Sequence, residues 1–218
     1  MCGRYSIFTP TDNLKIRFNV QRAEALKPTY NAAPTQNLPV ILNSDPTTIQ
    51  RCRWGLIPSW AKDQKIGNRM INARAETLLQ KPSFRTPFKK QRCLVLTDGF
   101  YEWKETPSGK IPHRISMRDN KPFAFAGIWE VWKTPNGENV KTFSIITTEP
   151  NELMKSLHNR MPVILRKENE VKWLQEIDTS EAQKRLEPYP FEDLEAYPIS
   201  TLVNSPRNNS KDIIKPLC

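Results

Sequence analysis

The sequence predicts a single α+β domain over residues 1–218, built on a curved, mainly antiparallel sheet with short helices attached. Three observations support this class. Segments rich in β-branched and aromatic residues outnumber helical ones. The 19 prolines against 7 glycines disfavour long helices. A hydrophobic content of 38% with 6 tryptophans is enough to bury a core, which excludes wholesale disorder.

The expected strands are short and are separated in several places by turn signals such as Pro107-Ser108-Gly109, Asp119-Asn120 and Pro135-Asn136-Gly137. They are residues 4–8, 38–42, 48–54, 92–96, 100–104, 113–117, 122–129 and 142–147.

The first expected helix begins after Thr9, with Thr9 as N-cap, Pro10 at the first helical position and Asp12 in the first turn. Further helices are expected over residues 73–79, 150–157 and 168–174. The polar C-terminal tail, about residues 204–218, is expected to be an irregular surface segment.

The formal net charge of +10 favours a polyanionic partner without identifying one. No apolar run approaches the roughly 20 residues of a membrane helix, and the N-terminus lacks a secretory signal. We therefore expect a cytoplasmic protein that associates with the nucleoid when bound to DNA, and no membrane partner.

The four cysteines are far apart and form no CxxC pair, and neither histidine is near a cysteine in the sequence. This spacing disfavours a zinc site, and a disulfide scaffold is unusual in an unsecreted chain of this size. Cys52 and Cys93 are expected to be buried in strands, and Cys218 to lie at a frayed terminus.

Cys2 has a chemistry that no internal cysteine has. Removal of Met1 leaves an N-terminal cysteine, with an amine of pKa about 7.7–8.0 beside a thiol of pKa about 8.5. Such a 1,2-aminothiol captures an aldehyde as an imine, which the sulfur closes to a thiazolidine. The thiol can alternatively serve as an acyl-transfer nucleophile with its own amine as base. The simplest alternative gives position 2 no chemical role.

Three other residues are candidates for the same chemistry. Glu102 lies between aromatic residues, where burial would raise its pKa and suit general acid catalysis, or it is an exposed strand carboxylate. His158 is expected at a helix end, as a catalytic or a structural residue. Asn72 is expected at a strand-to-helix junction, where an N-cap is the simpler interpretation.

Aromatic and basic residues alternate between Arg51 and Trp60 and again at Trp103-Lys104. Aromatic platforms combined with cations are typical of proteins that bind single-stranded nucleic acid. The alternative is a set of core tryptophans beneath a solvated basic face.

Six sequence blocks together resemble the SRAP family (SOS-response-associated peptidase, abasic-site processing proteins). They occur in the family's order, and residues 199–204 resemble its last block. The six blocks are Met1-Cys2-Gly3-Arg4, Tyr30-Asn31-Ala32-Ala33-Pro34-Thr35, Trp54-Gly55-Leu56-Ile57-Pro58, Ile71-Asn72-Ala73-Arg74-Ala75-Glu76, Asp98-Gly99-Phe100-Tyr101-Glu102-Trp103 and His158-Asn159-Arg160-Met161-Pro162.

The resemblance implies a barrel-like β core and a groove for single-stranded DNA that contains abasic sites. It implies that Cys2, once Met1 is removed, forms a covalent thiazolidine DNA–protein cross-link during the DNA damage response. The family's description also implies a peptidase activity that removes the residue before Cys2. No metal or other cofactor is implied, and we expect a monomer. By motif position, the catalytic residues would be Cys2, Asn72, Glu102 and His158, and the DNA-binding residues Arg4, Arg74, Arg160, Trp54, Pro58, Trp60 and Trp103.

Two other classes stay open at this point. A glutamine amidotransferase of the N-terminal-nucleophile type also begins with Cys-Gly, but Asn136-Gly137-Glu138 comes too late in the chain to bind its glutamine. A non-catalytic single-strand binding module would explain the charge and the tryptophans and would leave Cys2 without a role.

Overall fold

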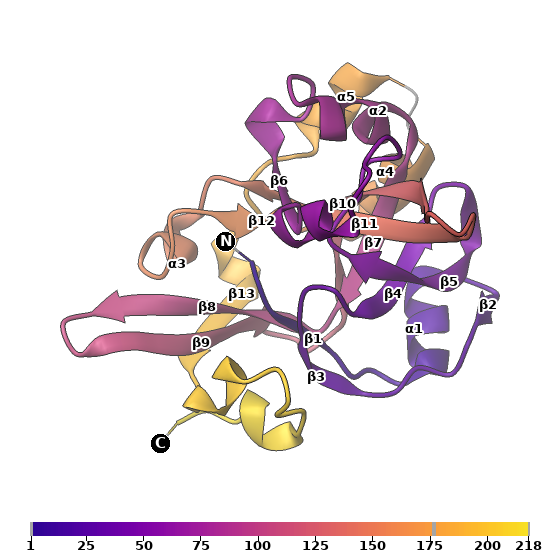
Figure 1. Ribbon diagram of the computed structural model, residues 1–218. Coiled ribbons are helices and arrows are strands. Elements are labelled where there is room, and N and C mark those ends of the chain that lie inside the picture. The colour runs from indigo at the N-terminus through magenta and orange to yellow at the C-terminus, as the bar shows by residue number, and fades with distance from the viewer. Residues whose placement is uncertain (1, 176–177, 218) are drawn as a thin grey trace.

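The computed structural model of the protein describes residues 2–175 and 178–217. Its strands form two sheets, with short helices around them (Figure 1). The predicted α+β class and the barrel-like core are both confirmed.

The larger sheet closes on itself. Its central strands run in the order β5, β4, β7, β10, β11 with antiparallel neighbours, and β11 then pairs in parallel with β5 through Phe143 and Trp54. The bounds of these strands are β4 (Asn37–Leu42), β5 (Asp45–Trp54), β7 (Arg92–Thr97), β10 (Phe123–Lys133) and β11 (Asn139–Thr148). Three short strands extend this sheet: β2 (Arg22–Ala23), β6 (Asn72–Arg74) and β12 (Met161–Pro162).

The smaller sheet has the order β13, β9, β8, β1, β3 and is antiparallel throughout. Its strands are β1 (Tyr5–Ile7), β3 (Thr29–Ala32), β8 (Gly99–Thr106), β9 (Gly109–Met117) and β13 (Leu194–Pro198). The β8–β9 hairpin extends beyond the core as an arm (Figure 1).

Aromatic residues join the two sheets into one core. The ring of Tyr5 in β1 lies 5.1 Å from that of Trp54 and 6.0 Å from that of Phe125, and all three residues are fully buried. Edge-to-face and tilted ring pairs of this kind add to the stabilisation from buried area. The strand β1, which directly follows the Cys2 segment, is therefore held against the barrel.

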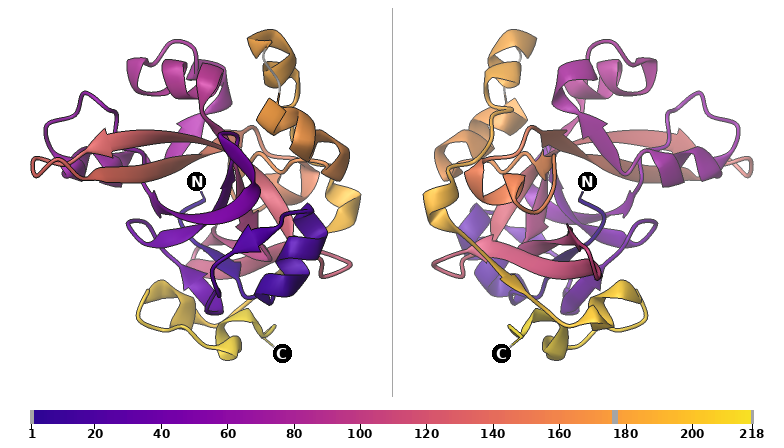
Figure 2. Two further views of the ribbon diagram at one scale, coloured as in Figure 1. Left: turned by 90° about the vertical axis from the view of Figure 1, so that its right-hand side faces the viewer. Right: turned by 90° about the vertical axis from the view of Figure 1, so that its left-hand side faces the viewer.

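The helices are short, as the proline content predicts. They are α1 (Thr11–Phe18), α2 (Pro82–Lys90), α3 (Glu152–Lys155), α4 (Lys167–Gln175) and α5 (Thr179–Lys184), and short 3-10 helices cover residues 64–69, 75–77, 191–193, 201–204 and 211–214. Figure 2 shows α2 and α5 at one end of the molecule and the C-terminal residues at the opposite end.

The predicted start of the first helix was wrong. The helix begins at Thr11, Pro10 is at the capping position, and no side chain caps the helix. The Thr9 hydroxyl instead donates to the carboxylate of Asp98, which also accepts the backbone N–H groups of Phe8 and Thr9. Because the Thr9 hydroxyl is bonded to Asp98, it does not cap the helix.

The predicted helix over residues 73–79 was also wrong. Residues 72–74 form β6, in which Ala73 pairs with Ile146 of β11, and a 3-10 turn follows over residues 75–77. Asn72 is therefore a strand residue and not an N-cap. The helix α2 was not predicted, because Pro87 in its interior disfavours a helix. The predicted helices at 150–157 and 168–174 are confirmed as α3 and α4.

The C-terminal tail is more closely packed than predicted. Ile199, Val203 and Ile213 form a small second core with Tyr101 of β8. Cys52 and Cys93 are buried in strands as predicted, whereas Cys218 lies outside the described residues.

Candidate active site

Cys2 lies just before β1, separated from it by Gly3 and Arg4, and is completely buried. The Asn72 side chain donates a hydrogen bond from Nδ2 to the Cys2 carbonyl oxygen at 2.8 Å. The thiol of Cys2 is directed to the carbonyl oxygen of Arg4 at 3.8 Å. Burial raises the pKa of the Cys2 thiol well above its usual range, and the nearby Glu102 carboxylate raises it further. The sulfur is therefore a protonated thiol at neutral pH, and it needs a neighbouring base before it can attack.

Glu102 comes from the middle of β8, where Gly99 begins the strand. A Cβ at position 99 would approach the carbonyl oxygen of Ile115 to 2.7 Å, so only glycine permits this close pairing of β8 with β9. The Glu102 side chain is buried, with 2% of the residue exposed, and burial raises its pKa to about 7. At neutral pH the group is divided between carboxylic acid and carboxylate, which suits both giving and accepting a proton.

His158 lies in the loop between α3 and β12 and is half-buried. Its Nδ1 lies 3.0 Å from the backbone nitrogen of Arg160 and 3.3 Å from the Arg160 carbonyl oxygen, and these contacts hold the ring in place. Partial burial is the main cause that lowers the pKa of His158 below its usual value. The ring is therefore mainly neutral at pH 7.

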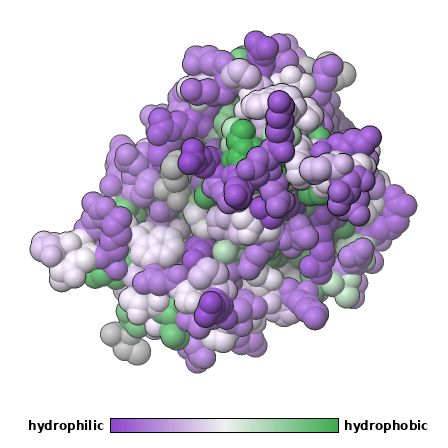
Figure 3. Space-filling view, viewed as in Figure 1, coloured by the Kyte–Doolittle hydropathy of each residue, from purple (hydrophilic) through white to green (hydrophobic). Residues whose placement is uncertain are grey.

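A cleft of about 1070 Å³ lies between the β8–β9 arm and the α3–His158 segment. Its walls include Glu102, Trp103, Lys110, His158 and Asn204. The face of the molecule shown in Figure 3 is mainly hydrophilic, and its hydrophobic residues form small separate areas. A charged, solvated chain is thus a better match for this cleft than an apolar ligand.

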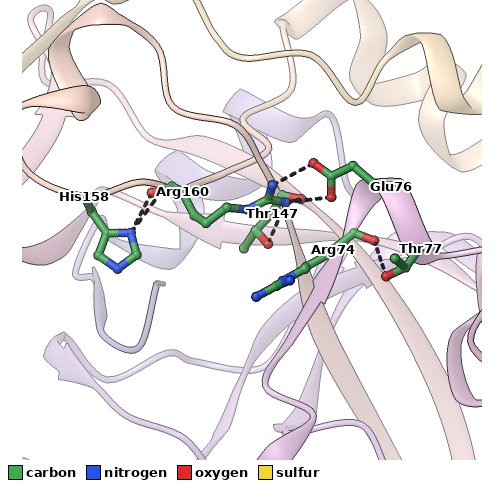
Figure 4. Close-up of polar contacts among 6 residues, drawn as sticks. All are labelled: Arg74, Glu76, Thr77, Thr147, His158 and Arg160. Carbon is green, nitrogen blue, oxygen red and sulfur yellow. Dashed lines mark hydrogen bonds and ion pairs between the residues drawn. The ribbon is translucent and has the colours of Figure 1, made fainter.

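Arg74 and Arg160 meet at Thr147 of β11. Arg74 in β6 pairs with Thr147 along the strands, and Arg160 donates from Nη2 to the Thr147 carbonyl oxygen at 2.7 Å. The Glu76 carboxylate also accepts hydrogen bonds from both terminal nitrogens of Arg160, at 2.6 and 2.9 Å. Figure 4 shows Arg74 extending alongside Arg160, with His158 beyond it. The two arginines and His158 therefore share one side of the site.

Arg4 has a different environment from the other two arginines. Its Nη1 donates to Asn31 Oδ1 at 2.8 Å and to the Val203 carbonyl oxygen at 2.7 Å, and its Nη2 donates to the Asn204 carbonyl oxygen at 3.2 Å. Burial lowers the pKa of Arg4. In this structure Arg4 ties the C-terminal segment to the N-terminal strand, so its expected role as a phosphate contact is not supported by its geometry.

The four candidate DNA-binding residues outside the arginines differ in their exposure. Trp54 and Pro58 are buried, and the Trp54 indole donates to the Ile71 carbonyl oxygen at 2.9 Å, so neither can contact DNA directly here. Trp60 has 61% of its surface exposed. Trp103 is half-buried at the cleft, and its indole N–H donates to Asn204 Oδ1 at 2.8 Å. Only Trp60 and Trp103 are accessible for stacking on a base.

Sequence reasoning missed Asn31, Glu76 and Asn204 as parts of this region. Asn31 lies next to Arg4, and its Nδ2 is within hydrogen-bonding distance of the carbonyl oxygens of Val203, Ser205 and Asn208. Asn31 and Glu76 both stand inside the sequence blocks quoted above, which was the available signal. Asn204 ends the 199–204 block and begins the polar tail, for which the sequence predicts only a surface position.

The turn that holds Asn136-Gly137-Glu138 connects β10 to β11, where the Gly137 N–H donates to the Thr134 carbonyl oxygen. None of these three residues lines the cleft. Within residues 2–175 and 178–217, no helix is both long enough and apolar enough to cross a membrane.

The chain is similar over its whole length to known proteins. It is 50% identical to the abasic site processing protein YoqW of Bacillus subtilis, over 99% of each chain. It is 34% identical to the abasic site processing protein HMCES of Gallus gallus, over 88% of this chain and 67% of that protein. A crystal structure of a protein from Bacteroides thetaiotaomicron superposes with a TM-score of 0.92 at 32% identity and covers 100% of both chains.

The family described as SOS response associated peptidase (SRAP) matches residues 1–206. This match takes in Cys2, Asn72, Glu102 and His158, together with both sheets that position them. The chain therefore belongs to the SRAP family.

Proposed function

We propose that the protein binds single-stranded DNA and captures abasic sites by forming a thiazolidine with Cys2 after Met1 has been removed. The observation that carries this proposal is the position of Glu102, a carboxyl group with a pKa of about 7 that lines the cleft and whose charge acts on the buried Cys2 thiol. The names of relatives such as YoqW, an abasic site processing protein, support the same substrate.

The reaction balances without a cofactor. An abasic sugar in its open form presents an aldehyde. The Cys2 amine adds to this carbon, water leaves to give an imine, and the Cys2 sulfur then adds to the same carbon. One C–N bond and one C–S bond form, the C=O bond is lost, and the thiol proton moves to the nitrogen by way of a neighbouring base. The adduct therefore has the mass of protein plus oligonucleotide minus one water.

The pKa directions support the following division of the proton transfers between two residues. Glu102, whose pKa burial raises to about 7, keeps a large acid fraction and donates a proton to the ring oxygen as the closed sugar opens. His158, whose pKa is lowered, is mainly neutral, and in the tautomer whose Nδ1–H donates to the Arg160 carbonyl oxygen its Nε2 accepts the proton of the thiol. Asn72 holds the Cys2 backbone by its amide N–H and hydrogen-bonds the sugar hydroxyl by its oxygen.

The DNA strand is held by charge and stacking. Arg74 is exposed at the site, and Arg160 lies beside it. Trp103 and Trp60 offer accessible rings for stacking. Contacts to phosphate are independent of sequence, so the protein would bind strands of any sequence.

The Cys2 amine must be free for this reaction, so removal of Met1 belongs to the proposal. An aminopeptidase can remove it, because cysteine at position 2 is small. The alternative is self-processing, which the family's description as a peptidase suggests. The mass of the purified protein reports which residue begins the chain.

The test is the intact mass of the protein after incubation with a single-stranded oligonucleotide that contains one abasic site. We expect a heat-stable species with the mass of both molecules minus one water, and no adduct with the undamaged oligonucleotide. Cys2→Ala should abolish the adduct and leave affinity for the strand within a few-fold.

Three outcomes would contradict the proposal. A heat-stable adduct that still forms with Cys2→Ala in the absence of a reductant would contradict a thiazolidine made by the Cys2 thiol. Binding without any adduct would indicate a non-catalytic binding module. Glutamine hydrolysis by wild type that is lost in Cys2→Ala would indicate an amidotransferase.

A further inference from the structure

A carboxylate already occupies the side of Arg160 on which a phosphate would bind. Glu76 accepts a hydrogen bond from Nη1 of Arg160 at 2.6 Å and another from Nη2 at 2.9 Å, so the contact is bidentate. The planar guanidinium binds carboxylate and phosphate with the same paired geometry. Figure 4 shows Glu76 at the terminal nitrogens of Arg160, on the side away from His158.

The two partners of this ion pair differ in their access to solvent. The Arg160 side chain has 16% of its surface exposed, whereas that of Glu76 has 52%. The inner side of Arg160 is bonded to the Thr147 carbonyl oxygen at 2.7 Å, and its Nε is buried without a hydrogen-bond partner among the described residues. A phosphate that arrives from solvent therefore meets the edge that Glu76 occupies.

The ion pair between Glu76 and Arg160 is of a kind in which another anion easily replaces the carboxylate. Ion pairs with an exposed partner contribute little to stability, because water solvates the separated charges well. Arg160 lowers the pKa of Glu76 by hydrogen bonding, so the carboxylate stays charged at neutral pH. Arg74 also acts on Glu76 electrostatically in the same direction. Glu76 therefore partly neutralises both arginines beside Thr147 of β11.

We propose that Glu76 is a built-in competitor for DNA phosphate at Arg160, released when the strand binds. This rests on the proposed function, in which Arg160 contacts the DNA backbone. In the free protein Glu76 holds the guanidinium in position and satisfies it. On undamaged single strands the competition lowers affinity, so the protein dissociates and continues its search. On an abasic strand the covalent bond to Cys2 retains the DNA despite that lower affinity, so Glu76 increases selectivity for damage.

The test compares Glu76→Gln with a matched variant. Glu24→Gln removes the same charge from another exposed arginine–glutamate pair, in which Glu24 lies 3.8 Å from Arg51 beside β2. Affinity for an undamaged oligothymidylate is measured by fluorescence anisotropy at several salt concentrations. Cross-linking to an abasic oligonucleotide is measured as initial rate against DNA concentration.

We expect Glu76→Gln to bind the undamaged strand roughly two- to fivefold more tightly than wild type, the range that an exposed ion pair spans. Its salt dependence should be steeper by up to about 0.7, the contribution of one phosphate contact on a single strand. In the cross-linking assay, the tighter binding should appear as a lower half-saturating DNA concentration. Glu24→Gln should show a smaller gain, and in an Arg160→Ala background Glu76→Gln should lose most of its effect.

Two results would overturn the inference while the proposed function stands. If Glu76→Gln binds no more tightly than Glu24→Gln, the carboxylate does not compete with phosphate. If it binds more weakly and its maximal cross-linking rate falls, Glu76 is a positioning residue for Arg160 and His158. Failure of the wild type to bind single strands, or to cross-link, would instead contradict the proposed function.

Discussion

The Asn72 amide donates a hydrogen bond to the carbonyl oxygen of Cys2 at 2.8 Å. This bond joins β6 to the start of the chain, two segments that are 70 residues apart. The amide oxygen of Asn72 is buried and has no hydrogen-bond partner among the described residues. One side chain therefore holds the proposed nucleophile and offers an acceptor for a substrate hydroxyl.

Replacing Asn72 should slow cross-linking in a way that depends on the replacement. Asn72→Ala removes both interactions, and we expect a loss of at least about tenfold in rate, equivalent to about 1.4 kcal/mol. Asn72→Asp should be worse, because its carboxylate would face the Cys2 carbonyl oxygen without a proton to donate. Single-turnover rates at saturating DNA measure the effect, with melting temperature as the check on folding. Wild-type rates in both variants would mean that the amide N–H is not required.

The rate of cross-linking should depend on pH through Glu102. Because burial raises its pKa to about 7, the acid form that opens the sugar is lost as pH rises above that value. The free Cys2 amine, with a pKa of about 7.7–8.0, limits the rate on the acid side. Glu102→Gln should be slower by about 10²–10⁴-fold and should lack the alkaline decrease, because Gln does not titrate. Rates across pH 5 to 9 test this, and an unchanged alkaline limb in the variant would remove Glu102 from the mechanism.

Glu102 should also make stability depend on pH, with a definite sign. Its folded-state pKa, about 7, is higher than the ordinary value of 4.5, so the folded state binds more protons between these two pH values. Stability therefore falls as pH rises through this window, by up to about 3 kcal/mol at pH 8. Glu102→Gln should remove this fall and be more stable than wild type at pH 8, with little difference at pH 4.

Urea unfolding at the two pH values measures that difference. Glu105→Gln is a suitable control, because Glu105 is an exposed residue of the same strand. If Glu102→Gln is less stable than wild type at pH 8, the carboxylate is a structural group and its catalytic assignment loses support.

Arg4 and Arg74 should respond differently to replacement by alanine. Arg74→Ala should weaken binding to all single strands and leave the melting temperature unchanged, since its side chain is exposed. Arg4→Ala should leave the Val203 and Asn204 carbonyl oxygens without that donor and destabilise the protein by about 1–3 kcal/mol. Hydrogen exchange should then be faster in residues 199–217.

Asn31→Ala should resemble Arg4→Ala, because Asn31 bonds both Arg4 and the C-terminal carbonyl oxygens. Asn68→Ala, an exposed asparagine, is the matched control. If Arg4→Ala keeps full stability and loses DNA affinity as Arg74→Ala does, Arg4 is a phosphate contact after all.

The sequence by itself determined the fold class and the positions of the barrel strands, because strand residues such as those of β10 and β11 follow local propensity and turn signals. It also placed Cys52 and Cys93 in buried strands, and the ordered blocks around Cys2 and Glu102 indicated the family. Local rules failed where a distant residue competed for a side chain, as Asp98 does for the hydroxyl of Thr9.

Only the tertiary structure decided which side chains are accessible and which are already bonded. Trp54 and Trp60 look equivalent in the sequence, yet the first lies in the core and the second in solvent. Arg4 is bound to carbonyl groups about 200 residues away, a contact that no local pattern reveals. The pKa of Glu102 has the same origin, because the desolvation that raises it comes from packing against segments far apart in the chain.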